Sequence, residues 1–491
     1  MKLTLHALSV MAVILLLSIG SDQSIFSSGT SSAKAHGINP SREVTARYGK
    51  AYLENVSGLL VLHVEGSPYE MGYQYGVLLK DRVRWMVQYY LYDIVIGRFG
   101  CSYQYLVQCS QVMEPHIPEE YIEEMHALAD GAEVNYTDLM LLNISTDVIM
   151  YGWTNSTSSS SNEPSLCSNF YVFEKATSDG HLIHARNNDW ILPSEPCGIV
   201  VVYEPDSGNS FVNIGAFSFL GTIVGINEKQ ISVDLKACSS NDKTLDGIPR
   251  HFMCRKALQY SENLSRAIEI VNQSDRTVGA MIGLGDGLNL NACALEISHN
   301  YCKIFWAGSH VEDIPPHYAI ENAIRRTNHF VDPELRATQS DAYDPRKDDA
   351  KMGWSWSRYE KLGQLILDNY GKIDAEKAIE FLRTPPITLP TNYQSIVLDA
   401  THLELWVANA NSTTPAYLQD YIHLSRSDLF PMETDLNKDR TVNILDITIV
   451  AAAYGSKPGD PKWNVLADLD MNGQVNIIDV TMVAKDYGKT V

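Results

Sequence analysis

Residues 167–190 read Cys-Ser-Asn-Phe-Tyr-Val-Phe-Glu-Lys-Ala-Thr-Ser-Asp-Gly-His-Leu-Ile-His-Ala-Arg-Asn-Asn-Asp-Trp. Apolar residues alternate on both sides of the turn-forming Thr-Ser-Asp-Gly at 177–180, a pattern typical of a β-hairpin. Such a hairpin returns Arg186 and Asp189 to the neighbourhood of Cys167. A thiol, a guanidinium and a carboxylate at the two ends of one hairpin are the components of a nucleophilic site.

The spacing of these residues is specific. Cys167, followed by Arg-Asn-Asn-Asp-Trp at 186–190, resembles the cysteine N-terminal-nucleophile hydrolases. Within them it is most similar to the acyl-coenzyme A:isopenicillin acyltransferase-like peptidases, which are related to choloylglycine hydrolases and acylethanolamine amidases. The resemblance implies an α+β fold, the four-layer αββα N-terminal-nucleophile sandwich. Alternation of strands and helices alone would not distinguish this fold from other layered architectures.

Other motifs of the same family are weaker and extend the resemblance over roughly residues 55–410. Residues 65–76 resemble its entry motif, a strand-to-helix turn with glycines for close packing. Thr-Asn-His-Phe at 327–330 resembles the element whose Asn, here Asn328, donates to the oxyanion, although such an Asn is more often a local cap. Trp-Ser-Trp-Ser-Arg-Tyr at 354–359 resembles a downstream helix start. Its Arg358 either lines the site or pairs with a carboxylate on the helix surface.

The resemblance also implies a role for each residue of the site. Once Cys167 is a chain terminus, its α-amine, with a typical pKa near ~7.7, can act as general base toward a thiol near ~8.5. Arg186 would favour the thiolate, and Asp189 would orient the α-amine. An internal Cys has no α-amine, so we expect autocatalytic cleavage of the bond between Leu166 and Cys167. The Ser-rich segment at 154–165 suits a loop that is cut, or alternatively an interdomain linker.

The rest of this region alternates between expected strands and helices. Helical periodicity runs from residue 77 to about 129 and is expected to end at a C′ glycine, Gly131. Strands are expected at 59–64, 199–203, 210–214, 221–233, 279–282, 292–297, 302–307, 394–399 and 403–408, and a helix at 249–273.

Composition and charge limit the classes of function. The chain has 491 residues, of which 45% are hydrophobic, and a formal net charge of -21. This charge argues against nucleic acid or an anionic membrane as partner. Eight cysteines are too few for a disulfide scaffold in a chain this long. Local pairs at 101–109 and 293–302 and burial as small hydrophobes are equally plausible.

Residues 1–35 have the pattern of a secretion signal. Lys2 and His6 precede an apolar run at 7–20, and Ala33-Lys34-Ala35 offers a cleavage site. The apolar run is shorter than the ~20 residues that span a bilayer, and no later segment is a candidate span. An uncleaved membrane anchor is the alternative.

The C-terminal tail contains an internal repeat of acidic twelve-residue loops, 435–446 and 468–479. Oxygen side chains at loop positions 1, 3, 5 and 12 suit a hard cation, and each loop runs into an apolar helix that ends in Tyr-Gly. The pair resembles a type I dockerin, which implies two Ca²⁺ ions and a cohesin-type scaffold partner. Arg440 replaces the turn glycine of the first loop; two plain acidic surface loops are the alternative. The expected calcium ligands are Asp435, Asn437, Asp439, Thr441, Asp446, Asp468, Asp470, Asn472, Gln474 and Asp479.

These features predict a signal at 1–35, a hydrolase domain at 36–428 and a dockerin at 431–491. The favoured function is a secreted cysteine amidohydrolase that cleaves a linear amide through an acyl-thioester on Cys167, with no cofactor for catalysis. Acyl transfer to an amine is an alternative. A non-catalytic, calcium-stabilised module delivered to a scaffold is another. The expected location is extracellular, or at the cell surface through a scaffold.

Overall fold

The computed structural model describes residues 41–153, 167–339 and 350–489, apart from residues 433, 438, 440 and 471. The predicted secretion signal, the polar segment at 154–165 and Leu166 lie outside the described residues, as does Arg440. Among the described residues, no helix is both long and apolar enough to cross a membrane.

Sheet A has ten strands in the spatial order β1-β2-β3-β6-β7-β8-β9-β10-β11-β12. Its neighbouring strands are antiparallel except β3 and β6, which run parallel. Because β3 precedes Cys167 in the sequence and β6 follows it, this pair joins the two sides of the predicted cut. The strands are β1 (Arg42–Tyr48), β2 (Ala51–Val56), β3 (Leu59–Gly66), β6 (Gly198–Pro205), β7 (Phe211–Ala216), β8 (Val224–Asn227), β9 (Ile231–Ala237), β10 (Ala280–Asp286), β11 (Asn291–Ile297) and β12 (Cys302–Trp306).

Sheet B has six strands in the order β13-β4-β5-β14-β15-β16, all antiparallel to their neighbours. The predicted hairpin at 167–190 is confirmed as β4 and β5, which lie near the middle of this sheet. The strands are β4 (Ser168–Glu174), β5 (Gly180–Asp189), β13 (Ala323–Arg326), β14 (Asn392–Asp399), β15 (Glu404–Asn409) and β16 (Ile422–Leu424).

The helices group by the sheet that they cover. The helical region predicted from residue 77 is interrupted and contains a π-helical segment, η1, and the helix predicted at 249–273 is two helices. The helices that cover sheet A are α2 (Pro68–Leu78), α3 (Lys80–Met86), η1 (Val87–Arg98), α4 (Tyr103–Met113), α5 (Glu119–Ala132), α6 (Tyr136–Trp153), α7 (Arg250–Gln259) and α8 (Leu264–Gln273). Helices α10 (Ala350–Asp368) and α11 (Ala375–Leu382) cover sheet B, and the shorter helices are η2 (Glu114–His116), η3 (His310–Glu312), α9 (Pro333–Thr338), η5 (Ala416–Leu418) and α12 (Arg426–Leu429).

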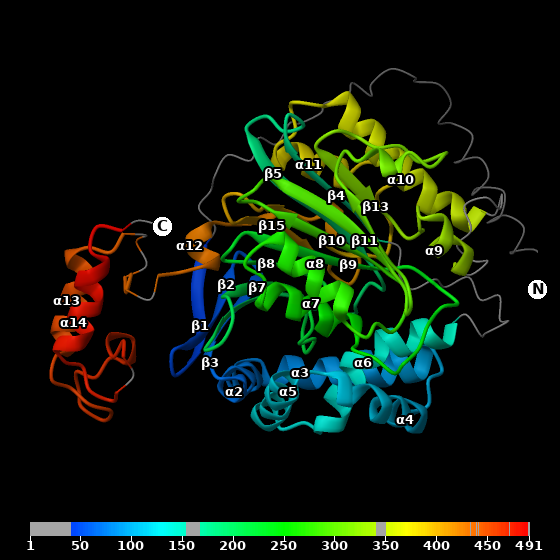
Figure 1. The fold of residues 1–491 in the computed structure, drawn as a ribbon. Coiled ribbons are helices and arrows are strands. Elements are labelled where there is room, and N and C mark those ends of the chain that lie inside the picture. The colour runs from blue at the N-terminus through cyan, green and yellow to red at the C-terminus, as the bar shows by residue number, and fades with distance from the viewer. Residues whose placement is uncertain are drawn as a thin grey trace, which may run out of the picture. The chain divides into compact units, whose positions relative to one another are not determined.

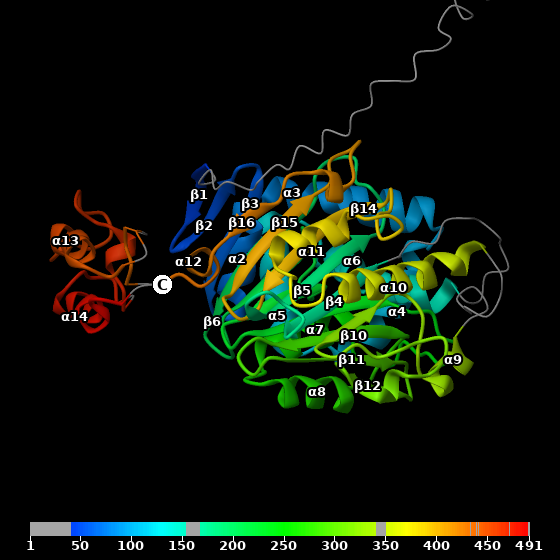
Figure 2. The ribbon, with the colours of Figure 1, turned by 90° about the horizontal axis from the view of Figure 1, so that it is seen from above.

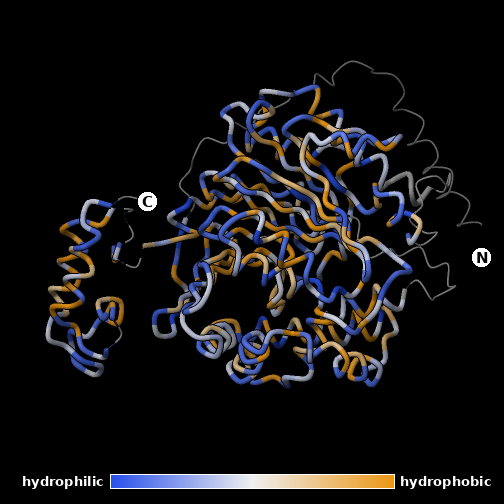
Figure 3. The backbone as a smooth tube through the Cα atoms, viewed as in Figure 1, coloured by the Kyte–Doolittle hydropathy of each residue, from blue (hydrophilic) through white to orange (hydrophobic). Residues whose placement is uncertain are grey.

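Three apolar cores hold these layers together. Residues 41–430 stack as helices, sheet A, sheet B and helices, which Figure 1 shows from the side and Figure 2 from above. One core lies between the sheets, where Tyr171 and Leu398 of sheet B pack with Val200 and Ile226 of sheet A. The other two lie between each sheet and its helices. Hydrophobic residues recur along the strands and helices that form these cores (Figure 3). The expected mixed α+β fold is therefore confirmed.

Helices α2 and α5 cross in backbone contact at glycines. A Cβ on Gly72 would lie 2.1 Å from the carbonyl oxygen of Glu124, and one on Gly76 would lie 2.4 Å from another carbonyl oxygen of α5. These distances exclude any side chain, so the sequence interpretation of these glycines as close-packing residues is confirmed.

Two expectations about helix ends are wrong. Gly131 lies inside α5, where a Cβ would meet the backbone of α2, and the left-handed residue that ends the helix is Glu133, with φ of 53°. The packing requirement at Gly131 therefore outweighs its use as a cap. Arg358 lies near the middle of α10 rather than at a helix start, because that helix begins at Ala350.

The C-terminal repeat forms two helices, α13 (Ile444–Ala453) and α14 (Ile477–Asp486), with the short helix η6 (Val465–Ala467) between them. Both helices begin with a reciprocal cap, in which Asn443 pairs with Asp446 and Asn476 pairs with Asp479. The helices share a small core of their own, which contains Val442, Val450, Ala453, Ala467, Leu469, Val475 and Val483.

Candidate active site

The hairpin β4–β5 places Arg186 beside Cys167. Its register pairs Ser168 with Asn187 and Asn169 with Arg186, so Cys167, just before β4, lies next to the end of β5. The Nη2 of Arg186 donates to the Cys167 sulfur at 3.4 Å, and this sulfur lies 3.9 Å from the carbonyl oxygen of Asp189. Both side chains are buried. A guanidinium in this position can stabilise negative charge that develops on the sulfur during attack.

Arg358 and Asn328 reach the same site from α10 and the turn after β13. Arg358 is fully buried and donates to the Cys167 carbonyl oxygen at 2.6 Å and to the Ser168 hydroxyl at 2.8 Å. Its Nη2 also donates to the Asn328 Oδ1 at 3.0 Å. Arg358 therefore lies at the site, which decides between the two positions that the sequence left open.

The Asn328 carboxamide is held from both sides. Its Oδ1 accepts from Arg358, and its Nδ2 donates to the Ala237 carbonyl oxygen at 2.8 Å. A carboxamide nitrogen has two hydrogens, so one remains for a further acceptor. The expected role of Asn328 as an oxyanion donor stays a prediction.

Asp189 is buried, and neither of its carboxyl oxygens has a hydrogen-bond partner among the described residues. Burial raises the pKa of Asp189 to about 8, although Arg358, Asn392 and Arg186 act in the opposite direction. In the uncut chain the carboxyl group is therefore mostly protonated at neutral pH. A new cation beside it, such as an α-ammonium, would favour its ionised form.

This raised pKa predicts a pH dependence of stability in the uncut Cys167→Ala chain. The folded chain retains the Asp189 proton up to about pH 8, whereas the unfolded chain loses it near pH 3.8. Stability should therefore fall as the pH rises between these values, by an amount on the order of 5 kcal/mol. Urea unfolding measures this fall as the difference in the free energy of unfolding between pH 5 and pH 8. The difference should be smaller in Cys167→Ala/Asp189→Asn than in Cys167→Ala. Equal pH slopes for both proteins would show that the Asp189 carboxyl is not the cause.

A second buried charge cluster supports Arg186 from sheet A. Asp234 and Lys236, both on β9, are fully buried and lie 2.7 Å apart. Asp234 also lies 3.2 Å from His184 Nε2 and 3.7 Å from Arg186 Nη1, and it accepts from the backbone N–H of Gly283. Burial lowers the pKa of Lys236 to about 8, although Asp234 acts in the opposite direction. Asp234 therefore links Lys236 to the guanidinium that contacts the Cys167 sulfur.

This cluster was not predicted from the sequence. Residues two apart on a strand share a face, so Asp234 and Lys236 on one strand were a visible signal of a polar face. That this face is buried against sheet B depends on contacts between residues 50 positions apart, such as that between His184 and Asp234.

An apolar pocket surrounds the reactive groups. Cys167, Arg186, Asn188 and Asp189 line one part of it. The rest of the lining is mainly apolar and aromatic, and includes Met86, Tyr90, Ile94, Met150, Trp190, Phe219 and Tyr393. Such a pocket favours an apolar group next to the polar atoms that react.

All eight cysteines carry free thiols, so the pairs considered at 101–109 and 293–302 are not formed. In the antiparallel pair β11–β12, Cys293 faces Trp306 and Cys302 faces Ile297. The register thus keeps these two sulfurs apart. Cys109, Cys197, Cys238, Cys254 and Cys293 are buried as small apolar residues, and Cys167 is buried at the site.

The two acidic loops differ in how far their carboxylates converge. In the second loop, oxygens of Asp468, Asp470 and Asp479 all lie within 4.8 Å of one another. Burial raises the pKa of Asp468, and the charges of Asp479 and Asp470 add to this effect. Its buried Oδ1 has no hydrogen-bond partner among the described residues. These carboxylates would fit a hard cation, which would remove their mutual repulsion.

The first loop has the same closing contacts but no such carboxylate cluster among its described residues. Asp446 accepts from the backbone N–H groups of Asn437 and Asn443, as Asp479 does from Leu469, Asp470 and Asn476. The expected ligands Asp435, Asp439, Thr441, Asn472 and Gln474 lie in these loops, and their coordinating role stays a prediction.

Comparison with known families assigns the two parts of the chain. Residues 175–389 match the model of the acyl-coenzyme A:6-aminopenicillanic acid acyl-transferase family, and residues 433–486 match that of the dockerin type I domain. The first match includes Arg186, Asp189, Asn328 and Arg358. The chain therefore contains a domain of this acyl-transferase family followed by a C-terminal type I dockerin.

The individual relatives share only a low sequence identity with this chain. An uncharacterized protein of Archaeoglobus fulgidus is 29% identical over 406 residues, which are 73% of this chain and 65% of that protein. The acyl-coenzyme A:6-aminopenicillanic-acid-acyltransferase 40 kDa form of Emericella nidulans is 24% identical over 46% of this chain and 61% of that protein. The matches span 54–65% of the lengths of the curated relatives.

A solved structure, the Caenorhabditis elegans ortholog of N-acylethanolamine-hydrolyzing acid amidase, matches with a TM-score of 0.36 and 15% identity. The match covers 48% of this chain and 93% of that chain.

Proposed function

We propose that the chain is the precursor of a secreted cysteine amidohydrolase with the four-layer αββα N-terminal-nucleophile fold. The proposed boundaries are 1–35 for the signal, 36–428 for the hydrolase and 431–491 for the dockerin. One observation carries the proposal: the Cys167 sulfur, 3.4 Å from Arg186 Nη2, shares an apolar pocket with the buried carboxyl group of Asp189.

The first step of the proposed mechanism is cleavage of the chain. The Cys167 thiol attacks the carbonyl carbon of Leu166, the C–N bond breaks as the acyl group moves to sulfur, and the nitrogen takes a proton. Water then hydrolyses this thioester and leaves a carboxylate on Leu166 and a free α-amine on Cys167. The products are residues 36–166 and 167–491. The α-ammonium would add a further cation beside Asp189 and favour its ionised form.

Amide hydrolysis then uses the same groups. The α-amine takes the thiol proton, the thiolate attacks the substrate carbonyl, and the second Nδ2 hydrogen of Asn328 stabilises the oxyanion. The amine leaves with the proton, and water releases the acyl group from sulfur. Arg186 stabilises the thiolate, while Arg358 holds both the Cys167 carbonyl and the Asn328 carboxamide in place.

The lining of the pocket supports a substrate with an apolar acyl group, which the pocket would hold. Apolar and aromatic side chains form most of its wall, and Arg186, Asn188 and Asp189 line the same pocket as Cys167. The proposed substrate is therefore a linear amide of an apolar acid, such as an N-acyl amino acid or a peptide with an apolar residue. The family match favours acyl transfer to an amine as the second candidate function.

The dockerin supports an extracellular location on a scaffold. We propose that its loops bind two Ca²⁺ ions and that it docks onto a cohesin-type protein. Ile444, Leu445, Ile477 and Ile478 are exposed at equivalent positions of the two repeats. Apolar residues exposed in this way are typical of a protein interface.

A series of N-acyl glycines with lengthening acyl chains tests the proposed activity. Because each buried methylene contributes ~0.8 kcal/mol, kcat/KM should rise roughly threefold to fourfold per methylene until the pocket is full. Glycine release by the processed protein measures hydrolysis, and a succinyl amide is the polar control. Added hydroxylamine should yield a hydroxamate if an acyl-thioester forms. A kcat/KM that does not depend on the length of the acyl chain, or no turnover of any amide, would contradict the proposal.

A further inference from the structure

Two histidines and an aspartate meet at the end of sheet B that lies away from Cys167. His181 is the second residue of β5, Asp399 is the last residue of β14, and His402 lies in the turn before β15. The antiparallel pairing of β5 with β14 matches Ile183 with Asp399, so strand register brings these segments together. Arg186 and Asp189 are at the other end of β5.

The three side chains converge on one oxygen. His181 Nδ1 lies 3.1 Å, and His402 Nδ1 3.2 Å, from the same Oδ2 of Asp399. The two imidazole rings are nearly perpendicular, at 88°, with their centroids 3.9 Å apart. Donor atoms from all three residues lie within 4.8 Å of one another.

These distances match the ligand set of a tetrahedral metal ion. Two donors at ~2.1 Å from zinc are ~3.4 Å apart at the tetrahedral angle, close to both nitrogen–oxygen distances here. Two imidazoles and one carboxylate are also the ligand types that zinc and its neighbours prefer. Two Nδ1–H groups that share one carboxylate oxygen would give similar distances, and a metal titration distinguishes the two arrangements.

The carboxylate is held in the orientation that a ligand needs. Asp399 is largely buried, and its Oδ1 accepts from the backbone N–H of His402 at 2.9 Å. That contact leaves Oδ2 directed at both histidines. The side chain of His402 is 53% exposed, so solvent can reach the site and supply a fourth ligand. Asp179 adds negative charge, with its Oδ2 3.4 Å from His181 Nδ1.

We propose that His181 and His402, through Nδ1, and Asp399, through Oδ2, bind a divalent transition metal ion of the zinc type. The ion would tie the beginning of β5 to the turn between β14 and β15. It is distinct from the hard cation that suits the acidic loops, because imidazole nitrogen is a poor ligand for calcium. The site is structural and takes no part in the proposed amide hydrolysis.

Cobalt titration of the full-length protein tests this site. The protein is treated with chelator and returned to excess calcium, so that the acidic loops are occupied before Co²⁺ is added. We expect one equivalent of Co²⁺, with weak visible bands and no intense thiolate charge-transfer band. Zinc should displace it and raise the melting temperature by a few degrees. His181→Ala and His402→Ala should each weaken binding at least tenfold and abolish the zinc shift.

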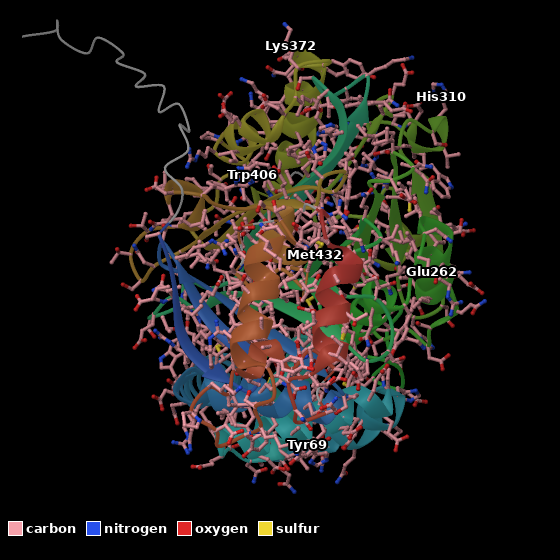
Figure 4. The ribbon with its side chains drawn as sticks, turned by 90° about the vertical axis from the view of Figure 1, so that its left-hand side faces the viewer. Tyr69, Glu262, His310, Lys372, Trp406 and Met432 are labelled. Atoms are coloured by element: carbon pink, nitrogen blue, oxygen red, sulfur yellow. The ribbon has the colours of Figure 1, made fainter. Side chains whose placement is uncertain are left out.

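His310→Ala is the matched control. His310, labelled in Figure 4, also pairs through Nδ1 with a carboxylate, Asp313 at 2.8 Å, but has no second histidine in that pair. Its loss should leave Co²⁺ binding unchanged. Without metal, His181→Ala and His402→Ala should have nearly the melting temperature of the metal-free wild type, because both side chains are partly exposed. No Co²⁺ binding, binding unchanged in His181→Ala, or a thiolate band that survives both histidine changes would overturn the proposal.

Discussion

Cys167→Ala is expected to abolish amide hydrolysis and to leave the protein as a single chain. Removal of a covalent nucleophile costs on the order of 10⁵–10⁶-fold in kcat. The same sulfur starts the proposed self-cleavage, so both reactions should fail together. Denaturing electrophoresis and the release of amine from an N-acyl amide measure the two effects.

Cys302→Ala is the matched control for this change. Cys302 is a half-buried thiol on β12 and is not among the residues that line the pocket of Cys167. This variant should be processed into two chains and should hydrolyse amides at the wild-type rate. Hydrolysis by Cys167→Ala would refute the assignment of the nucleophile. Wild-type protein that is active as one full-length chain would refute the cleavage scheme.

Asp479→Ala is expected to remove one of two bound calcium ions and to destabilise the C-terminal helix pair. Asp479 is fully buried, closes the second loop through three backbone N–H groups, and joins Asp468 and Asp470 in the carboxylate cluster. A helix pair with so small a core depends on its metal for stability. Calorimetric titration of the full-length protein with Ca²⁺ should give two equivalents for wild type and one for the variant.

Two further variants sharpen this test. Asp446→Ala removes the equivalent residue of the first loop, in which the carboxylates do not converge, and should affect the weaker of the two sites. Asp460→Ala changes an exposed acid between the loops, where it accepts from Lys457, and should leave both ions bound. Two equivalents in Asp479→Ala, or no calcium binding by wild type, would contradict the proposed loops.

The sequence predicted the elements whose signals are local. Alternation around a four-residue turn was enough for β4 and β5, and the spacing of Cys167 and Arg186 then followed from antiparallel register. The close-packing role of the glycines of α2 was also predicted from the sequence. The position of Gly131 inside α5 was not predicted, because only the approach of another helix explains why the helix continues through this glycine.

The parts of the candidate site that the sequence could not supply depend on long-range burial. Arg358 was ambiguous until the packing of α10 placed it on the Cys167 carbonyl. Asp234 and Lys236 lie just beyond the strand expected at 221–233, and their spacing does not say that their face of the strand meets another sheet. The isolation of the Asp189 carboxyl is likewise a property of the folded environment.

The parallel pair β3–β6 has a consequence for the molecularity of folding. Its six residue pairs, from Val61 with Val200 to Gly66 with Pro205, connect segments on opposite sides of residues 166 and 167. A cut there turns one sheet into the interface of an obligate heterodimer. Unfolding then separates two chains, so reassembly becomes bimolecular and depends on protein concentration. The uncut precursor would refold as one molecule, whereas the two cleaved chains, once unfolded and diluted, would no longer be joined by the peptide bond that held their strands in register.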